Sequence, residues 1–535
     1  MLRKLIALGV FAAALAPSAY LAWRFQAMPH LGFYHDDSLY WVSAKSLAER
    51  GEYRIASLPG QPFQAKYPPL YPALLAVIWK IDPQFPSNIP LATMLAWLFL
   101  PLYLALVWAF LGRYGFSFRD RCILTAFAGL NPVAATFSVS LMPELLFTAL
   151  LLASMWMAEA EQRVRWLALA AGICAGLAYL AKSSAAPLLI TAPLCFLWRR
   201  QFAKAGLFFA GMAPAVLGWQ WWSSQHVSHS WDLVTLYYTN YLGFQIYNVP
   251  LRDLPLVFWH NLDGFIMAIG KVLTFDVQWG AKALERIVAV GAIAGTIRLG
   301  RRTGLLQYPA AALGISGILL VWHYVPDQRF VFPLYPLLLA GLWTELSNVC
   351  QTLRAAWQKN KSGERVVAFG GAAALAALAL FVGFTSLNGL FSFLPDLFAS
   401  YGAAFAAREP AYQWIAKHAP ETANVFAYDD PMLYLYTGRK SCNLPIPPKL
   451  YYHDDDAGID RLLASIPDFA RQYSLSYVLL TPGDFYRDLH EPGAAHLANA
   501  VQHSGAFEQE FQTPSASVYR FTAPSPLQSR LGNPR

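Results

Sequence analysis

The sequence predicts a polytopic α-helical membrane protein with a small α/β domain at its C-terminal end. Hydrophobic residues make up 56% of the 535 residues and charged residues only 13%, whereas soluble globular domains carry roughly 25% charged residues. Apolar stretches near the ~20 residues needed to cross a bilayer recur over the first three quarters of the chain. Beyond residue 395 the apolar stretches become short and alternate with polar ones, which is typical of a water-exposed domain.

About eleven apolar stretches are expected to cross the membrane, some of them short. They are Leu5–Trp23, Ile89–Leu111, Cys122–Ser140, Glu144–Met157, Trp166–Leu180, Ala185–Trp198, Ala205–Trp222, Ile287–Leu299, Leu305–Trp322, Phe330–Leu346 and Val366–Leu394. The first follows Arg3 and Lys4 and has an alternative interpretation as a cleaved signal peptide. Because its apolar part is longer than the 7 to 15 residues of a typical signal core, we expect it to stay as a helix.

The distribution of Arg and Lys predicts the orientation. If the N-terminus is cytoplasmic, the alternate short loops on that side are rich in Arg and Lys, as the positive-inside rule requires. The C-terminal part then lies outside. The chain divides into a transmembrane domain, 1–395, with a first outer loop at about 24–88 and a long fourth outer loop at about 223–286, and an exported α/β domain, 396–535, with a flexible tail. The pI near 9.1 thus reflects topology, and we expect no nucleic-acid partner.

The exported part is expected to alternate helices and strands. Helices are predicted at 410–418 and 459–472, and strands at 424–428, 475–480, 507–511 and 517–521. The only Asn-x-Ser/Thr sequon, Asn360–Ser362, falls in a predicted cytoplasmic loop, so a bacterial inner membrane is the expected location. The five cysteines indicate no disulfide framework.

Two segments of the first outer loop are apolar without being long enough to span. Residues 38–50 place Leu39, Val42 and Leu47 on one helical face, and Ser38 is placed to cap this helix. We expect it to be an amphipathic helix on the membrane surface. Residues 66–80 start a second helix at a Pro-Pro pair and are expected to dip into the interface.

The candidate polar residues all fall on the predicted outer face. They are His35, Asp36 and Asp37 in the first outer loop, Lys66 and Tyr67 farther along it, and Glu144, Lys182, His323, Tyr324 and Arg329 at or near the outer ends of spans. Several loops thus point to one external site. The tetrapeptide at residues 34–37, YHDD, recurs at 452–455, where a position before a helix start explains its charges. We therefore leave the second copy out of the site.

Each candidate also has a structural interpretation. The aspartates can cap a helix, Arg329 can snorkel to the interface, and Glu144 can complement a helix dipole. A divalent metal ion held by His35 and the aspartates, with Glu144 as an extra ligand, is an open alternative, although three adjacent residues are a poor ligand set by themselves. The sequence has no HExxH, P-loop or CxxC motif, so no cofactor is otherwise indicated.

The order of these motifs resembles a known enzyme family. The acidic pair, Lys66-Tyr-Pro-Pro-Leu-Tyr, Met142-Pro-Glu, the LAYLAKSSA stretch around Lys182, the DQRFVFPLYPLLLA stretch around Arg329 and LYLYTGRK near residue 440 follow one another in the chain. This order resembles the GT-C integral-membrane glycosyltransferases, in particular the aminoarabinose lipid A transferases and the protein O-mannosyltransferases. The resemblance covers the whole membrane part.

The resemblance implies inverting transfer of a sugar from a polyprenyl-phosphate-linked donor to an acceptor hydroxyl, on a glycolipid such as lipid A, a polysaccharide or a protein, at the outer face. It implies that Asp36 or Asp37 is the catalytic base, with Asp36 favoured by its place in the motif, and that Lys66, Arg329 and Lys182 bind the donor phosphate. His35, Glu144, Tyr67, His323 and Tyr324 are further candidate contacts. Rival interpretations are a lipid transporter or flippase without glycosyl transfer, a scaffold with an outer binding domain, and a ligase that transfers a whole glycan.

Overall fold

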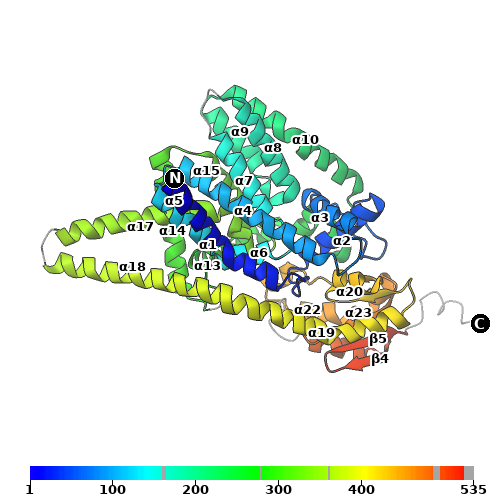
Figure 1. Cartoon of the computed structure of the whole chain (residues 1–535). Helices are drawn as coiled ribbons and strands as arrows, with labels where there is room; N and C mark the ends of the chain where they lie inside the picture. Colours follow the sequence, from blue (N-terminus) through cyan, green and yellow to red (C-terminus); the bar gives the residue numbers. More distant parts are fainter. Residues whose placement is uncertain (160–163, 278, 359–361, 486–493, 523–535) are drawn as a thin grey trace, which may run out of the picture.

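The structure is a computed structural model that describes residues 1–159, 164–277, 279–358, 362–485 and 494–522. A helical bundle makes up most of it, and a smaller α/β part closes one end (Figure 1). The predicted flexible tail and the sequon residues Asn360 and Lys361 lie outside the described residues.

Within the described ranges, six helical segments are long and apolar enough to cross a membrane. They are Leu2–Arg24 (α1), Ile89–Arg113 (α4), Phe202–His226 (α10), Leu251–Thr274 (with α13, Leu254–Thr274), Gln328–Gln358 (with α16, Gln328–Val331, and α17, Tyr335–Gln358) and Ser362–His418 (with α18, Ser362–Asn388, and α19, Leu394–His418). Five shorter apolar helical segments accompany them. They are Leu70–Ile81 (α3), Glu144–Ala158 (α7), Trp166–Ala181 (α8), Ser183–Trp198 (with α9, Leu188–Trp198) and Gln307–Leu320 (α15). The chain is an integral membrane protein.

Two predicted spans differ from the helices observed. The stretch 122–140 is broken into α5, Phe118–Gly129, and α6, Pro132–Ser138, because the Asn131 side chain caps α6 and Pro132 cannot continue α5. The stretch 287–299 belongs to the longer α14, Lys282–Thr303, which is less apolar than the segments above because it carries several charges.

The helix α13 falls within the predicted fourth outer loop, although it is long enough to span. Two contacts join it to the same end of the bundle: Asn261, in the first half of α13, donates to the carbonyls of Leu319 and Trp322 at the end of α15, and the carbonyl of Asp276, just after α13, accepts from Gln328 at the start of α16. The helix therefore runs across that end of the bundle rather than through it. Two shorter helices precede it in the loop, α11 (Leu233–Thr239) and α12 (Tyr241–Asn248).

The first-loop helix α2, Asp36–Arg50, differs from its prediction in two ways. It begins two residues earlier than expected, so His35 precedes it and both aspartates lie in its first turn. It is also not a surface helix, because nearly every side chain from Asp37 to Ala44 is buried. Both α3 and the C-terminal helix α20, Asp430–Thr437, pack against it, and Trp79 donates to the carbonyl of Trp41.

The C-terminal part contains a five-stranded mixed sheet in the order β2-β1-β3-β5-β4. The strands β2, β1 and β3 are parallel, while β5 pairs antiparallel with both β3 and β4. The strands are Asn424–Phe426 (β1), Lys440–Cys442 (β2), Leu475–Leu480 (β3), Phe507–Thr513 (β4) and Ala516–Phe521 (β5). The helices around them are α20, Pro448–Tyr452 (α21), Asp456–Ala464 (α22), Ile466–Gln472 (α23) and Ala494–His503 (α25).

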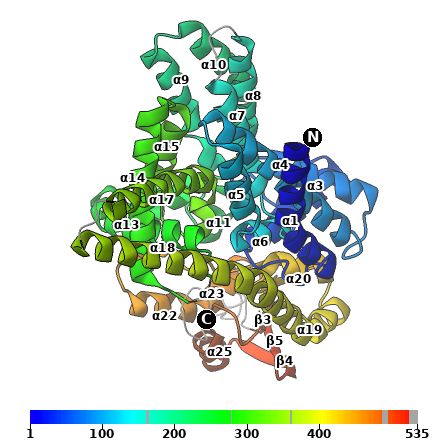
Figure 2. The ribbon, with the colours of Figure 1, turned by 60° about the vertical axis from the view of Figure 1, so that its left-hand side comes forward.

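The C-terminal part is joined to the bundle by covalent continuity and by contacts. The helices α18 and α19 continue into one another through a π-helical turn at Gly389–Phe393, and together they form one long rod that reaches the sheet (Figure 1; Figure 2 shows it from another side). At the sheet edge, the Ser441 amide of β2 donates to the carbonyl of Ser57 in the first loop at 2.8 Å. The first loop thus covers the free edge of β2 and is fixed between the bundle and the sheet.

The packing of α8 against α10 depends on glycine. A Cβ at Gly172 would lie 2.0 Å from the carbonyl oxygen of Phe208, whereas a Cβ at Gly206, on α10, would meet nothing within 4 Å. We predict that Gly172→Ala lowers the thermal unfolding temperature, at a cost of about 1–3 kcal/mol for the displaced backbones. Gly206→Ala should be neutral or stabilising by up to about 1 kcal/mol, because alanine favours a helix. Unfolding of the two purified variants in detergent, followed by tryptophan fluorescence, tests this; equal effects would contradict the close contact.

Candidate active site

A buried cluster of charged side chains lies where the first outer loop meets the ends of several helices. Arg329 is its centre: its Nη2 donates to Asp36 Oδ2 at 2.5 Å and its Nε to Glu144 Oε1 at 2.6 Å. The same Glu144 oxygen accepts from Lys182 Nζ at 2.7 Å. Asp36 Oδ1 in turn accepts from the Tyr67 hydroxyl at 2.5 Å. Four segments far apart in the sequence therefore meet in one network.

Local sequence explains each position. Asp36 lies in the first turn of α2 and Glu144 in the first turn of α7, where a carboxylate complements the helix dipole. Arg329 lies in the first turn of α16, where Asp327 caps the helix by accepting from the Arg329 and Phe330 amides. Lys182 directly follows α8.

The Lys66 ammonium group lies beside this cluster in a cage of tyrosines. It donates to the carbonyl oxygen of Tyr237 at 2.7 Å and lies 4.4–5.0 Å from the ring centroids of Tyr67, Tyr237 and Tyr241. Burial lowers the pKa of Lys66 to about 8, partly offset by the Asp36 charge. The described residues place no carboxylate within ion-pair distance of Lys66, so its charge is only partly compensated.

The two adjacent aspartates point in different directions. Asp36 faces the cluster, whereas Asp37 is fully buried and accepts from the backbone amides of Ser38 and Gly32. Burial opposes ionisation of Asp36, but the charges of Arg329 and Lys66 outweigh it and lower the pKa to about 2. Burial raises the pKa of Asp37 to about 7, although its backbone hydrogen bonds act in the other direction. Asp36 is therefore the carboxylate held ionised in the cluster.

His35 points away from the cluster and toward the C-terminal part. Its Nε2 lies 2.9 Å from Asp430 Oδ1, and the same oxygen accepts from the Tyr238 hydroxyl at 2.7 Å. Burial alone would lower the pKa of His35, but the hydrogen bond and charge of Asp430 raise it above its usual value. The His35 backbone has a φ of 60°, an uncommon conformation for a non-glycine residue. The contact with Asp430 thus fixes the residue directly before Asp36.

The two remaining candidates, His323 and Tyr324, lie on the other side of the lysine cage. His323 Nδ1 lies 2.6 Å from Gln245 Oε1, and its ring contacts Phe244 and Trp322. Trp322 in turn packs on Tyr241 of the cage. The Tyr324 ring is tilted against the His323 ring, with 4.6 Å between the ring centroids, and is partly exposed. The hydrogen bonds of His323 among the described residues go to Gln245 and not to the Arg329 network.

Asp430 and the tyrosines Tyr237, Tyr238 and Tyr241 contact the candidate residues but were not predicted from the sequence. Asp430 begins α20 in the segment YDDPM, where the only signal is an ordinary helix start with proline in the first turn. The tyrosines fall in the fourth outer loop among many aromatic residues, which an interfacial belt explains equally well.

The pairing of the candidate ligands does not fit the alternative in which His35, the aspartates and Glu144 bind a divalent metal ion. Asp36 and Glu144 are bound to cations, and His35 is bound to Asp430. Among the described residues, no group of three or more His, Cys, Asp or Glu side chains could hold a metal ion. Arg329 and Lys182 are paired with Asp36 and Glu144, whereas Lys66 has no carboxylate within ion-pair distance among the described residues, which suits an anionic ligand.

Apolar helices around a buried, cation-rich site define an integral membrane protein with a polar site at one end of its helical bundle. No protein-family model matches the chain, and no curated protein sequence matches it. Among solved structures, ArnT from Cupriavidus metallidurans in the apo state is similar with a TM-score of 0.51 and 14% identity over 97% of this chain and 98% of that one. The structure of this ArnT bound to undecaprenyl phosphate gives 0.49 and 14% over 100% and 99%. Arabinofuranosyltransferase AftD from Mycobacteria gives 0.50 and 16% over 98% of this chain and 40% of that one.

The comparison confirms the resemblance to the GT-C glycosyltransferases at the level of the fold, because the similarity to apo ArnT extends along almost all of both chains. The fold alone does not define the reaction, which depends on the side chains of the charged cluster.

The His35–Asp430 contact predicts energetic coupling between the first loop and the C-terminal part. A double-mutant cycle of His35→Ala and Asp430→Ala should give a coupling energy of about 0.5–3 kcal/mol, because both groups contact each other in a buried place. The second YHDD copy supplies the control: His453 pairs with Asp253 at 3.1 Å, and the His453 side chain is 46% exposed. The effects of His453→Ala and Asp253→Ala should be additive within about 0.5 kcal/mol. Chemical unfolding in detergent measures both cycles, and equal coupling in the two would contradict the proposed anchoring.

Proposed function

We propose that this chain is an inverting glycosyltransferase that moves a sugar from a polyprenyl-phosphate-linked donor to an acceptor hydroxyl at the outer face of the membrane. The observation that carries the proposal is the buried cluster of Arg329, Lys182 and Lys66 where the loops meet the helix ends, in which Lys66 has no carboxylate within ion-pair distance among the described residues. The fold supports it, since apo ArnT shares the fold and ArnT has also been solved bound to undecaprenyl phosphate. The acceptor is a hydroxyl of a glycolipid such as lipid A, a polysaccharide or a protein.

The phosphate of the donor would be bound by cations of different kinds. Lys66 is the first contact, because it is bound to a carbonyl and to aromatic rings and has no carboxylate within ion-pair distance among the described residues, so it need not give up an ion pair to bind an anion. Arg329 is the second, since a guanidinium can hold a phosphate with two parallel hydrogen bonds. Lys182 contributes charge while remaining paired with Glu144. Glu144 therefore acts as a positioning residue that keeps Arg329 and Lys182 beside the phosphate.

The same Arg329 restrains Asp36. With a pKa of about 2, Asp36 is ionised but is a weak base, and general bases are most effective when their pKa is near the working pH. When the donor phosphate draws the guanidinium toward itself, Asp36 loses its strongest neutralising partner and becomes more basic. Donor binding would thus activate the base.

The reaction is a single displacement. The acceptor oxygen attacks the anomeric carbon, and its proton passes to Asp36. The bond between that carbon and the phosphate oxygen breaks with its electron pair going to the phosphate, which leaves as polyprenyl phosphate beside Lys66 and Arg329. A general base in such a position contributes a factor of roughly 10²–10⁴. Attack from the side opposite the phosphate inverts the anomeric configuration.

The orientation follows from the same proposal. The cluster, the first loop and the C-terminal part lie at one end of the bundle, while Arg3, Lys4, Arg113, Arg119 and Arg121 lie at the other end of α1, α4 and α5. By the positive-inside rule the second end is cytoplasmic. The C-terminal α/β part is then periplasmic, in a bacterial inner membrane, and it closes over the first loop at the site.

Loss of Asp36 should abolish transfer. We predict that Asp36→Asn reduces sugar transfer from a panel of radiolabelled polyprenyl-phosphate sugars to a membrane extract by about 10²-fold or more. Asp454→Asn, at the matching position of the second YHDD copy and exposed, is the control and should keep wild-type activity. Consumption of no donor by the wild type, or full activity of Asp36→Asn, would refute the proposal and favour the transporter.

The pH dependence of sugar transfer should reflect the ionisation of Lys66. Because the pKa of Lys66 is about 8, its ammonium form is present below that pH and is lost above it, so kcat/KM should fall as the pH rises through about 8. Lys66→Arg should move this fall to higher pH, since arginine stays charged. The control is Lys440→Arg: burial also lowers the pKa of Lys440 to about 8, but its ammonium group donates to the carbonyl of Ala56, outside the cluster. A fall that moves with Lys440 but not with Lys66 would contradict the assignment.

A further inference from the structure

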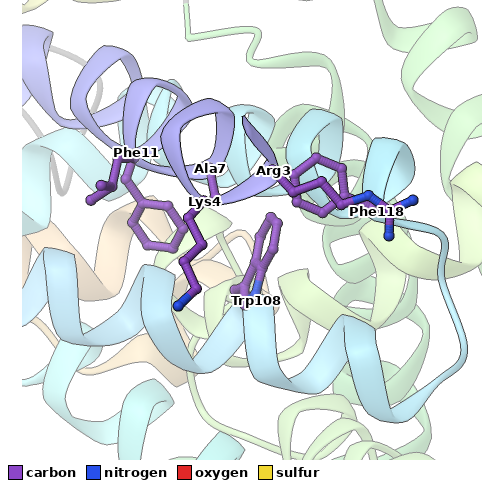
Figure 3. Close-up of a pocket in the computed structure, with 7 residues that line it drawn as sticks. Arg3, Lys4, Ala7, Phe11, Trp108 and Phe118 are labelled. Atoms are coloured by element: carbon purple, nitrogen blue, oxygen red, sulfur yellow. The ribbon is translucent and has the colours of Figure 1, made fainter. Parts of the chain in front are cut away.

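We propose that a cavity between α1, α4 and α5, at the end of the bundle opposite the candidate active site, binds an anionic glycerophospholipid. The cavity has a volume of about 410 Å³. It is lined by Arg3, Lys4, Ala7, Leu8, Phe11, Trp108 and Phe118. Figure 3 shows the aromatic side chains gathered along the gap between the helices, with Arg3 and Lys4 reaching into this region from α1.

The cavity has two chemically different parts. Ala7, Leu8 and Phe11 follow one another along α1, away from its N-terminus, and Trp108 faces them from α4. Arg3 and Lys4 lie at the N-terminal end of α1, and the Arg3 guanidinium is 5.8 Å from the Phe118 ring centroid. A ligand that fits both parts has a hydrocarbon chain and an anionic head. A free phosphate ion would use only the basic part.

The basic residues around the cavity are not neutralised by the protein. In the described part of the chain, Arg3, Lys4, Arg119 and Arg121 make none of the ion pairs, although carboxylates neutralise many other arginines. The nearest acidic residue in the sequence, Asp120, accepts instead from the Ser117 hydroxyl at 2.7 Å.

The surroundings of Arg121 also favour an anionic ligand at this cavity. Its guanidinium lies 4.1 Å from the ring centroid of Trp108, a residue that lines the cavity. Its Nε is buried and has no hydrogen-bond partner among the described residues. A buried donor left without a partner is costly, so the Arg121 side chain, packed on the cavity-lining Trp108, has a donor left over for an anionic acceptor.

The position in the membrane selects a lipid. The cavity lies at the first turns of α1 and the last turns of α4, two helices long and apolar enough to cross the bilayer. In the orientation proposed above this end is cytoplasmic, and basic pockets between transmembrane helices on that side bind anionic head groups. The first turns of α1 are exposed, including Leu2, Leu5 and Leu8. A bound acyl chain would cover this part of α1 and join it to α4. The site is separate from the catalytic cluster, because α1 has 23 residues and a helix of that length spans about 35 Å.

The test is lipid binding by the purified full chain after delipidation in detergent, measured by native mass spectrometry. The probes are dioctanoyl phosphatidylglycerol, dioctanoyl phosphatidylcholine and inorganic phosphate. The anionic lipid should bind at least about 10-fold more tightly than the zwitterionic one, and the double variant Arg3→Gln/Lys4→Gln should weaken it by about 10-fold or more. The double variant Arg200→Gln/Arg354→Gln removes two charges from exposed arginines elsewhere and should bind as the wild type does.

The basic start of α1 also guides membrane insertion, so the first double variant can fail to fold. Arg121→Gln therefore serves as a second variant and should weaken binding of the anionic lipid severalfold. Equal affinity for the two lipids would overturn the proposal, because it would show that the cavity binds acyl chains without recognising an anionic head group. Full competition by inorganic phosphate would overturn it by showing a free-anion site, and equal losses in the Arg200→Gln/Arg354→Gln control would show a general charge effect.

Discussion

The ion pairs of Arg329 are the interaction on which the rest of the site depends. Asp36 and Glu144 both bond to this guanidinium, in a place where Glu144 is completely buried. An ionised carboxylate taken out of water is very unfavourable without a partner. Four parts of the chain must therefore converge on one point: the start of α2, the start of α7, the residue after α8 and the start of α16. The helix ends and loops at this side of the bundle are arranged around that requirement.

The helical membrane fold and the candidates Asp36, Glu144, Lys182 and Arg329, which the structure brings together, could be predicted from the sequence, while the details of the fold and of their contacts could not. Apolar length and charged ends indicate spans and an outer face, because the bilayer restricts where charges lie. The burial of α2 was not predictable, since its periodicity fits a surface helix equally well, and the covering elements α3 and α20 are distant in sequence. The contact of Asp430 with His35 was not predictable for the same reason, because the two residues are 395 positions apart in the sequence. The break at Asn131-Pro132, in contrast, has a local signal that marks helix boundaries.

The two YHDD copies show how context decides what the same residues do. In the first copy, Asp36 enters a buried network and His35 bonds to a fully buried carboxylate. In the second copy, Asp455 caps α22 by accepting from the Gly458 amide, and His453 pairs with Asp253 at a partly exposed position. Short motifs thus have little meaning without their location in the fold. The location of the first copy, beneath the C-terminal part, also gives that part a role in holding the site together.

The anomeric configuration of the transferred sugar tests the central claim most directly. The account places one carboxylate, Asp36, at the reacting centre as a base in a single displacement, with the cations on the departing phosphate. Transfer from a donor of defined configuration, with the product analysed by NMR before it can isomerise, should give inversion. Retention would contradict the account, because it requires two displacements and a covalent glycosyl intermediate on a nucleophile.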